Sequence, residues 1–181
     1  HLPLLQELQK DFELDENIFG EACAGGNLEI ARWLKSEGCP WDERASTGAA
    51  CGGHLETLKW LWSEDCPWDE EACYCAAQSG HFEVVKWLVS GGCPWDGACS
   101  AAASGGHFEV FQYIIDRTVD KSPVDVSGNT PLHEAAAEGY LNVCMLMMNE
   151  DLDNFNTRNN DGKTPDDLAG MDICKYIWDI F

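Results

Sequence analysis

The chain has 181 residues, and its 32 aspartates and glutamates far outnumber its 11 lysines and arginines, giving a formal charge of −21 at pH 7. This charge argues against nucleic acid and against an anionic membrane surface as partners, because both attract basic proteins. No apolar run approaches the roughly 20 residues of a membrane-spanning helix, so we expect no direct membrane insertion. The composition instead favours another protein, with a basic or neutral surface, as the partner.

A short sequence, Cys-Pro-Trp-Asp, recurs at a fixed interval. It begins at Cys39, Cys66 and Cys93, which are 27 residues apart, and His54 and His81 keep the same interval. A period of this length is typical of a solenoid, in which each repeat buries its apolar face only against its neighbours. We therefore expect a single repeat domain over residues 1–181.

In chain order, residues 1–12 carry the leucine spacing of half a repeat, and four short repeats follow at 13–39, 40–66, 67–93 and 94–120. The half repeat suggests that further repeats precede it. In the repeat at 67–93, apolar residues at helical spacing predict a first helix over 70–78 and a second over 81–90. Gly80 separates the two helices, and glycine followed by proline ends the second.

After residue 120 the spacing lengthens and a known pattern emerges. The segment from Gly128 through Thr130-Pro131-Leu132-His133 to Gly139 resembles the ankyrin repeat, and Thr164-Pro165 repeats its opening. The resemblance divides the remainder into a full-length repeat at 121–155 and a C-terminal capping repeat at 156–181, with a closing helix over 172–181. The shorter repeats resemble the divergent ankyrin arrays of giant viruses and unicellular eukaryotes.

This resemblance implies an all-α, ankyrin-type helical solenoid of paired antiparallel helices. The 27-residue repeats lack about six of the roughly 33 residues of an ankyrin repeat. The missing residues fall where the family has its projecting β-hairpin finger, so we expect reduced fingers in the N-terminal repeats.

The recurring cysteines and histidines first suggest a disulfide framework or a metal site. Equivalent positions in stacked helices lie about 10 Å apart, which is too far for a disulfide or for a shared zinc ion. We therefore expect reduced thiols, an intracellular and cytoplasmic location, and no metal or other cofactor. Cys73 and Cys75 are interpreted as packing thiols, and the histidines as hydrogen-bonding groups between repeats.

The tryptophans of the recurring sequence allow two interpretations. Trp41, Trp68 and Trp95 could be exposed anchors for a partner, because tryptophan is enriched at binding hot spots. Alternatively, they pack along the stack in place of the missing fingers. Their recurrence in every short repeat favours packing.

In the ankyrin family, partners usually bind the groove formed by the fingers and the exposed face of the first helices. Acidic residues recur at the turn positions, so we expect a negative groove. The residues that we expect to contact a partner are Asp42, Glu43, Asp69, Glu70, Tyr74, Gln78, Ser104, Asn129 and Glu138.

No set of residues predicts catalysis, so we do not expect an enzyme. The sequence favours a protein-interaction module that acts as a scaffold or accessory subunit of a larger assembly. The alternative is the substrate-recruiting adaptor arm of an enzyme complex whose effector domain lies outside this chain.

Overall fold

The computed structural model describes residues 14–117, 124–150 and 156–169, and in these residues it contains helices and no strand. The predicted half repeat at 1–12 and the predicted helix at 172–181 lie outside the described residues. The helices are α2 (Glu16–Ala24), α3 (Leu28–Ser36), α4 (Glu43–Cys51), α5 (Leu55–Ser63), α6 (Glu70–Gln78), α7 (Phe82–Ser90), α8 (Ala98–Ser104), α9 (Phe108–Ile115), α10 (Pro131–Glu138), α11 (Leu141–Glu150) and α12 (Pro165–Leu168).

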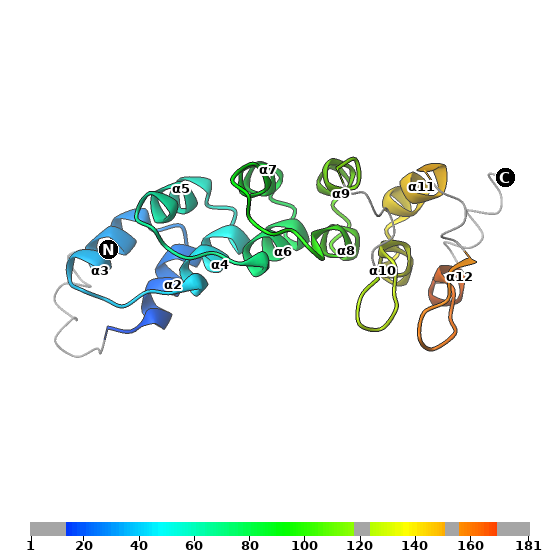
Figure 1. Cartoon of the computed structure of the whole chain (residues 1–181), viewed down its shortest axis with the longest axis horizontal. Helices are drawn as coiled ribbons and strands as arrows, with labels where there is room; N and C mark the ends of the chain where they lie inside the picture. Colours follow the sequence, from blue (N-terminus) through cyan, green and yellow to red (C-terminus); the bar gives the residue numbers. More distant parts are fainter. Residues whose placement is uncertain (1–13, 118–123, 151–155, 170–181) are drawn as a thin grey trace. The chain divides into compact units, whose positions relative to one another are not determined.

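The chain falls into two compact units. The first contains the residues up to Ala76 together with Glu83–Pro94, and the second contains Ala77–Phe82 together with the chain from Trp95 onward. In the first unit, α2, α4 and α6 form one layer and α3, α5 and α7 the other (Figure 1). In the second unit, α8, α10 and α12 form one layer and α9 and α11 the other. The finer repeat boundaries given above remain a prediction.

Each repeat forms two helices and not one long helix, because glycine ends the first helix and allows the chain to turn. After α2, Gly26 adopts a left-handed backbone with φ of +68°, and the N–H of the next residue donates to the carbonyl of Ala22 at 3.0 Å. An equivalent bond, from a backbone N–H to the carbonyl five residues earlier in the last turn of the helix, recurs after α4, α8 and α10. Only glycine adopts this conformation without a steric cost, so its recurrence fixes the turn between the two helices.

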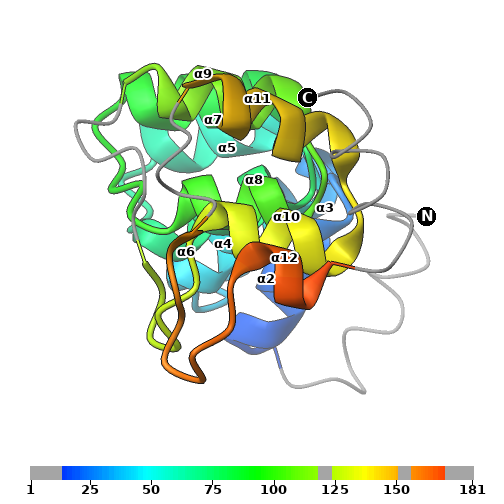
Figure 2. The same ribbon diagram turned by 90° about the vertical axis from the view of Figure 1, so that its right-hand side faces the viewer.

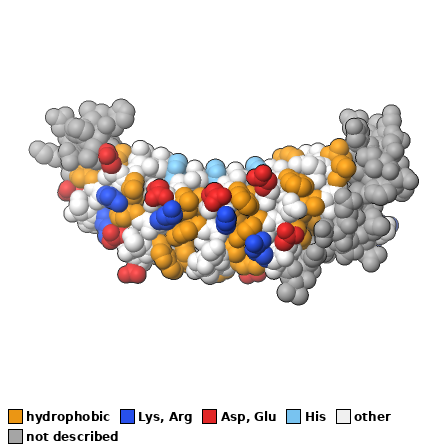
Figure 3. Space-filling model, turned by 90° about the horizontal axis from the view of Figure 1, so that it is seen from above, with side chains coloured by type: hydrophobic (Ala, Val, Ile, Leu, Met, Phe, Trp, Pro, Cys, Tyr) orange, Lys and Arg blue, Asp and Glu red, His pale blue; other side chains and the backbone are white. Residues whose placement is uncertain are grey.

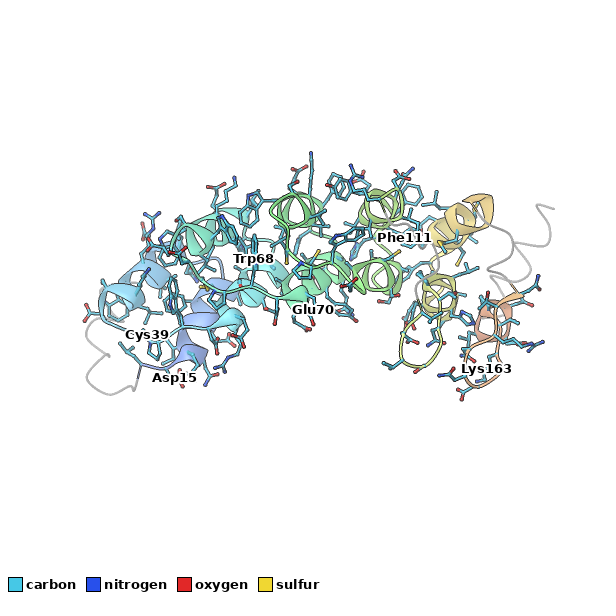
Figure 4. The ribbon with its side chains drawn as sticks, viewed as in Figure 1. Asp15, Cys39, Trp68, Glu70, Phe111 and Lys163 are labelled. Carbon is cyan, nitrogen blue, oxygen red and sulfur yellow. The ribbon has the colours of Figure 1, made fainter. Side chains whose placement is uncertain are left out.

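The core of each unit lies between its two layers. The first helices contribute alanines that are fully buried, such as Ala49 and Ala76, and the second helices contribute larger residues such as Leu61. In the second unit, Phe111 of α9 is completely buried (Figure 4). Small residues on the first helices let neighbouring backbones approach closely, and the larger residues of the second helices fill the remaining space.

The fingers expected from the ankyrin resemblance are not seen as β-hairpins in the described residues. Tight turns stand before α10 and α12, closed by hydrogen bonds between Asp125 and Asn129 and between Asn159 and Lys163. The two turns lie side by side (Figures 1 and 2), and the Asn160 N–H donates to the Ser127 carbonyl at 2.9 Å. Contact between successive turns is thus present without the regular pairing of strands.

Candidate functional site

In the first unit, Asp15, Asp42 and Asp69 cap the first helices α2, α4 and α6. The Asp15 carboxylate accepts a hydrogen bond from the Ile18 N–H at 2.9 Å, and Asp42 accepts one from the Arg44 N–H at 3.0 Å. Asp69 accepts one from the Glu71 N–H at 3.1 Å. An aspartate at this position satisfies amide groups that would otherwise lack a partner at the start of the helix. Asp42 and Asp69, predicted to contact a partner, therefore also have a structural role.

Hydrogen bonds favour the ionised form of the Asp15 and Asp42 carboxylates. The bond from the Ile18 amide, followed by the one from the Asn17 side chain, lowers the pKa of Asp15 below its ordinary value. The pKa of Asp42 is lowered chiefly by the Arg44 side chain. Both groups are therefore negatively charged at neutral pH.

Arg44 connects the beginnings of α2 and α4. Its guanidinium lies 2.7 Å from the Asp42 carboxylate and 3.3 Å from that of Glu16, and it donates to the Asn17 side-chain oxygen at 2.6 Å. The arginine side chain is about half exposed, so water screens these ion pairs. The network fixes the position of Arg44 and offsets part of the local negative charge.

A shallow hollow of about 340 Å³ lies on the face of α2, α4 and α6. Gly20 and Gly48 are among the residues that line it. The backbones of α2 and α4 are so close here that a Cβ atom on Gly48 would lie 3.0 Å from the Gly20 carbonyl oxygen. Glu16, Glu21 and Arg44 line it, and Cys51 and Cys75 lie at its α6 side. We call the exposed side of α2, α4 and α6, including this hollow, the first-helix face. Asp15 and Glu70 mark the beginnings of α2 and α6 in Figure 4.

Charge is distributed unequally between the two layers of the first unit. Helices α2, α4 and α6 carry five glutamates and a single arginine, whereas α3, α5 and α7 carry three glutamates against four basic residues. In the second layer, Lys59 pairs with Glu56 at 2.7 Å, and Lys86 lies 3.9 Å from Glu83. Figure 3 shows acidic and basic side chains interspersed on this layer. The negative charge of the helices in this unit is therefore concentrated on the first-helix face.

Two of the recurring tryptophans pack between repeats. The Trp41 ring meets Phe19 edge to face at a centroid distance of 5.3 Å and lies 6.2 Å from Trp60. Trp68 stacks on Trp62 at 3.9 Å and meets Trp87 at 5.5 Å. Each ring thus connects aromatic residues of two successive predicted repeats, which supports the packing interpretation.

The recurring cysteines donate hydrogen bonds to backbone carbonyls within their own predicted repeats, just before the first helices. Cys39 donates to the Asp15 carbonyl at 3.2 Å, and Cys66 and Cys93 donate to the equivalent carbonyls of Asp42 and Asp69 at 3.5 and 3.1 Å. Burial raises the pKa of Cys66 and of Cys93 to about 11, so both thiols remain protonated donors.

The Nε2 atom of His54 lies 2.9 Å from the Ala24 carbonyl at the end of α2, so the predicted hydrogen bond between repeats is confirmed for this histidine. In the described part of the chain, no group of three or more His, Cys, Asp or Glu side chains is placed to hold a metal ion.

The other residues predicted to contact a partner differ in how accessible they are. Tyr74 on α6 is half-buried, whereas Gln78 and Glu138 are exposed. The Ser104 hydroxyl donates to the Ala101 carbonyl of its own helix at 3.1 Å. The Asn129 side chain bonds with Asp125, Glu134 and Asn159, and we assign it to the contact between the two turns.

Sequence reasoning did not identify Arg44 as a member of the first-helix face. Nothing in the period could indicate Arg44, which appears in one repeat only.

Comparison with known proteins identifies the repeat type. A family model described as ankyrin repeats in three copies matches residues 19–97 and again residues 98–178. No curated protein sequence matches the chain. None of the described helices is long and apolar enough to cross a membrane.

Proposed function

Because the chain belongs to the ankyrin repeat family, whose members are generally protein–protein interaction modules, we propose that it binds a basic partner protein through the first-helix face of its first unit. The observation that carries this proposal is the charge difference between the layers, with five glutamates and one arginine on α2, α4 and α6. Complementary charge steers association and selects partners.

Glu43 and Glu70 are the residues that we expect to contribute most to this recognition. Both are exposed at the beginnings of their helices, whereas the neighbouring Asp42 and Asp69 are half-buried and bonded to backbone amides. Tyr74 adds a half-buried aromatic ring on α6. In the second unit, Gln78, Ser104 and Glu138 remain proposed contact positions at the ends of the first helices.

The proposal is tested by selecting binders from a library of random peptides displayed on phage. We expect the selected peptides to be rich in lysine and arginine, and their affinity to fall as salt rises, since exposed charges are screened within about 8 Å at physiological ionic strength. Changing Glu43→Lys and Glu70→Lys together should weaken binding by about tenfold or more.

The matched control changes Glu29→Lys and Glu56→Lys, which are also exposed glutamates in first turns but belong to α3 and α5. This control should leave peptide binding unchanged. Selection of neutral or acidic peptides, or equal losses in both double variants, would show that the first-helix face does not recognise a basic partner.

A scaffold subunit and a substrate-recruiting adaptor would both use such a face. The fate of the bound partner distinguishes these two roles. A structural protein that stays bound favours the scaffold, whereas a protein that is modified after binding favours the adaptor.

A further inference from the structure

Ala24 and Gly48, which are 24 residues apart, meet where α2 packs on α4. A Cβ atom on Gly48 would lie 3.1 Å from the Cβ of Ala24. The equivalent positions one repeat later are Cys51, the last residue of α4, and Cys75 in the middle of α6. Disulfides require Cβ atoms about 3.5–4.5 Å apart. If α4 and α6 pack as α2 and α4 do, moving the helices apart by a few tenths of an ångström brings the Cβ atoms of Cys51 and Cys75 into this range. The repeat geometry therefore places two thiols at a separation suited to a disulfide.

The two cysteines also share one environment. Both line the hollow on the first-helix face, and Cys51 is among the neighbours that raise the pKa of Cys75. Cys75 lies 3.7 Å from the Glu71 carboxylate oxygen. Cys51 is exposed and Cys75 is half-buried. A small oxidant can therefore reach the first thiol directly, and the second lies beside it.

We propose that Cys51 and Cys75 are a reversible disulfide site that joins α4 to α6 at the edge of the hollow. The oxidant is a low-molecular-weight disulfide such as glutathione disulfide. The Cys51 thiolate attacks one sulfur of this molecule, forms a mixed disulfide and releases one glutathione thiolate. Cys75 then loses its proton to solvent and attacks the Cys51 sulfur, which releases the second glutathione. Two protein thiols are oxidised, and one glutathione disulfide is reduced to two glutathione molecules.

The order of the two steps follows from the surroundings of the thiols. Burial, followed by the neighbouring Cys51 and Glu71, raises the pKa of Cys75 to about 12. Because the thiolate is the nucleophile, Cys75 reacts only after Cys51 has captured the oxidant. The second step is therefore expected to be the slower one and to accelerate as pH rises.

Other described cysteines are protected from the same reaction. Cys39, Cys66 and Cys93 are buried and bonded to carbonyl groups. Cys23, Cys73, Cys99 and Cys144 are also buried, and burial raises the pKa of each to between about 11 and about 12. Among the described cysteines the reaction is therefore selective for one pair.

The test incubates the whole chain with glutathione disulfide, traps the remaining thiols with iodoacetamide, and measures intact mass and peptide maps. Compared with the fully reduced and alkylated chain, the wild type should lack the carbamidomethyl groups of Cys51 and Cys75 and yield a peptide linked through these two residues. Cys75→Ala should stop at one glutathione on Cys51, and Cys51→Ala should form neither product. Cys144→Ala, a control in the second unit, should still form the link.

Circular dichroism spectra of the four proteins check that each variant folds. The proposal is overturned if the wild type stays fully reduced, if it stops at a mixed disulfide on Cys51, or if the linked peptides join a different pair. Formation of a mixed disulfide between glutathione and Cys75 in Cys51→Ala would also overturn it, because Cys75 would then react without Cys51. These readouts involve no partner, so they are independent of the proposed binding function.

Discussion

Replacing Phe19 tests whether the ring cluster holds successive repeats together. Phe19 is completely buried in α2, with its ring 5.3 Å from Trp41 and 6.4 Å from Trp60 between centroids. Removing a buried phenylalanine ring costs about 3–5 kcal/mol, out of a total stability of about 5–15 kcal/mol for a typical domain. Phe19→Ala should therefore remove a large part of the stability of the first unit.

Phe19→Leu separates ring contacts from simple burial. Leucine keeps most of the apolar volume but loses two aromatic pairs, each worth about 0.5–1.5 kcal/mol, so we expect a loss of about 1–3 kcal/mol. Urea unfolding followed by circular dichroism and by tryptophan fluorescence measures both variants, and Trp41 and Trp60 are two of the eight tryptophans that contribute to the fluorescence. A loss below about 1 kcal/mol for Phe19→Ala, or equal losses for the two variants, would refute the reasoning.

Two further predictions concern the ends of helices. Asp42→Ala should lower stability by about 1 kcal/mol, with a smaller loss for Asp42→Asn, which can still cap the helix. Arg44 holds the pKa of Asp42 in the folded state below its ordinary value. The negative charge of the Asp42 carboxylate therefore contributes to the free energy of unfolding above about pH 4, and this contribution disappears as pH falls through the folded pKa. The difference between wild type and Asp42→Asn in urea unfolding should therefore shrink below about pH 4, and a constant difference would contradict the role of the charge. Asp65 has a left-handed backbone with φ of +59°, where glycines stand in the neighbouring repeats, so Asp65→Gly should raise stability by about 1 kcal/mol and Asp65→Ala should not, as measured by thermal unfolding.

The helices were predictable because their ends are marked in the sequence. The first helix predicted over 70–78 is α6 itself, and the second, predicted over 81–90, begins one residue later at Phe82. Glycine and proline determine these ends locally, so no knowledge of tertiary structure is needed. The ankyrin resemblance, carried by residues such as Thr130-Pro131 and Gly139, is confirmed by the family match over most of the chain.

The candidate site was less predictable, because its residues depend on contacts between repeats. Cysteines one full repeat apart lie about 10 Å from each other, too far for a disulfide, but this distance does not apply to cysteines at non-equivalent positions. Cys51 and Cys75 are 24 residues apart, and their proximity depends on how α6 is rotated against α4. The double role of Asp42 and Asp69 was also missed, although an aspartate just before a helix is a recognised capping signal.

What remains informative about the first-helix face is its lack of lysine. An acidic residue in the first turn stabilises the helix dipole, and all six helices from α2 to α7 have one, so these glutamates alone indicate no partner. The dipole gives no reason, however, for lysine to be absent from α2, α4 and α6 while it occurs in α3, α5 and α7. Solubility would be served equally well by mixed charges on both layers. The absence of lysine from one layer is therefore the feature that favours a basic partner over helix stabilisation alone, and the paired charge reversals on α4 and α6 and on α3 and α5 test that distinction.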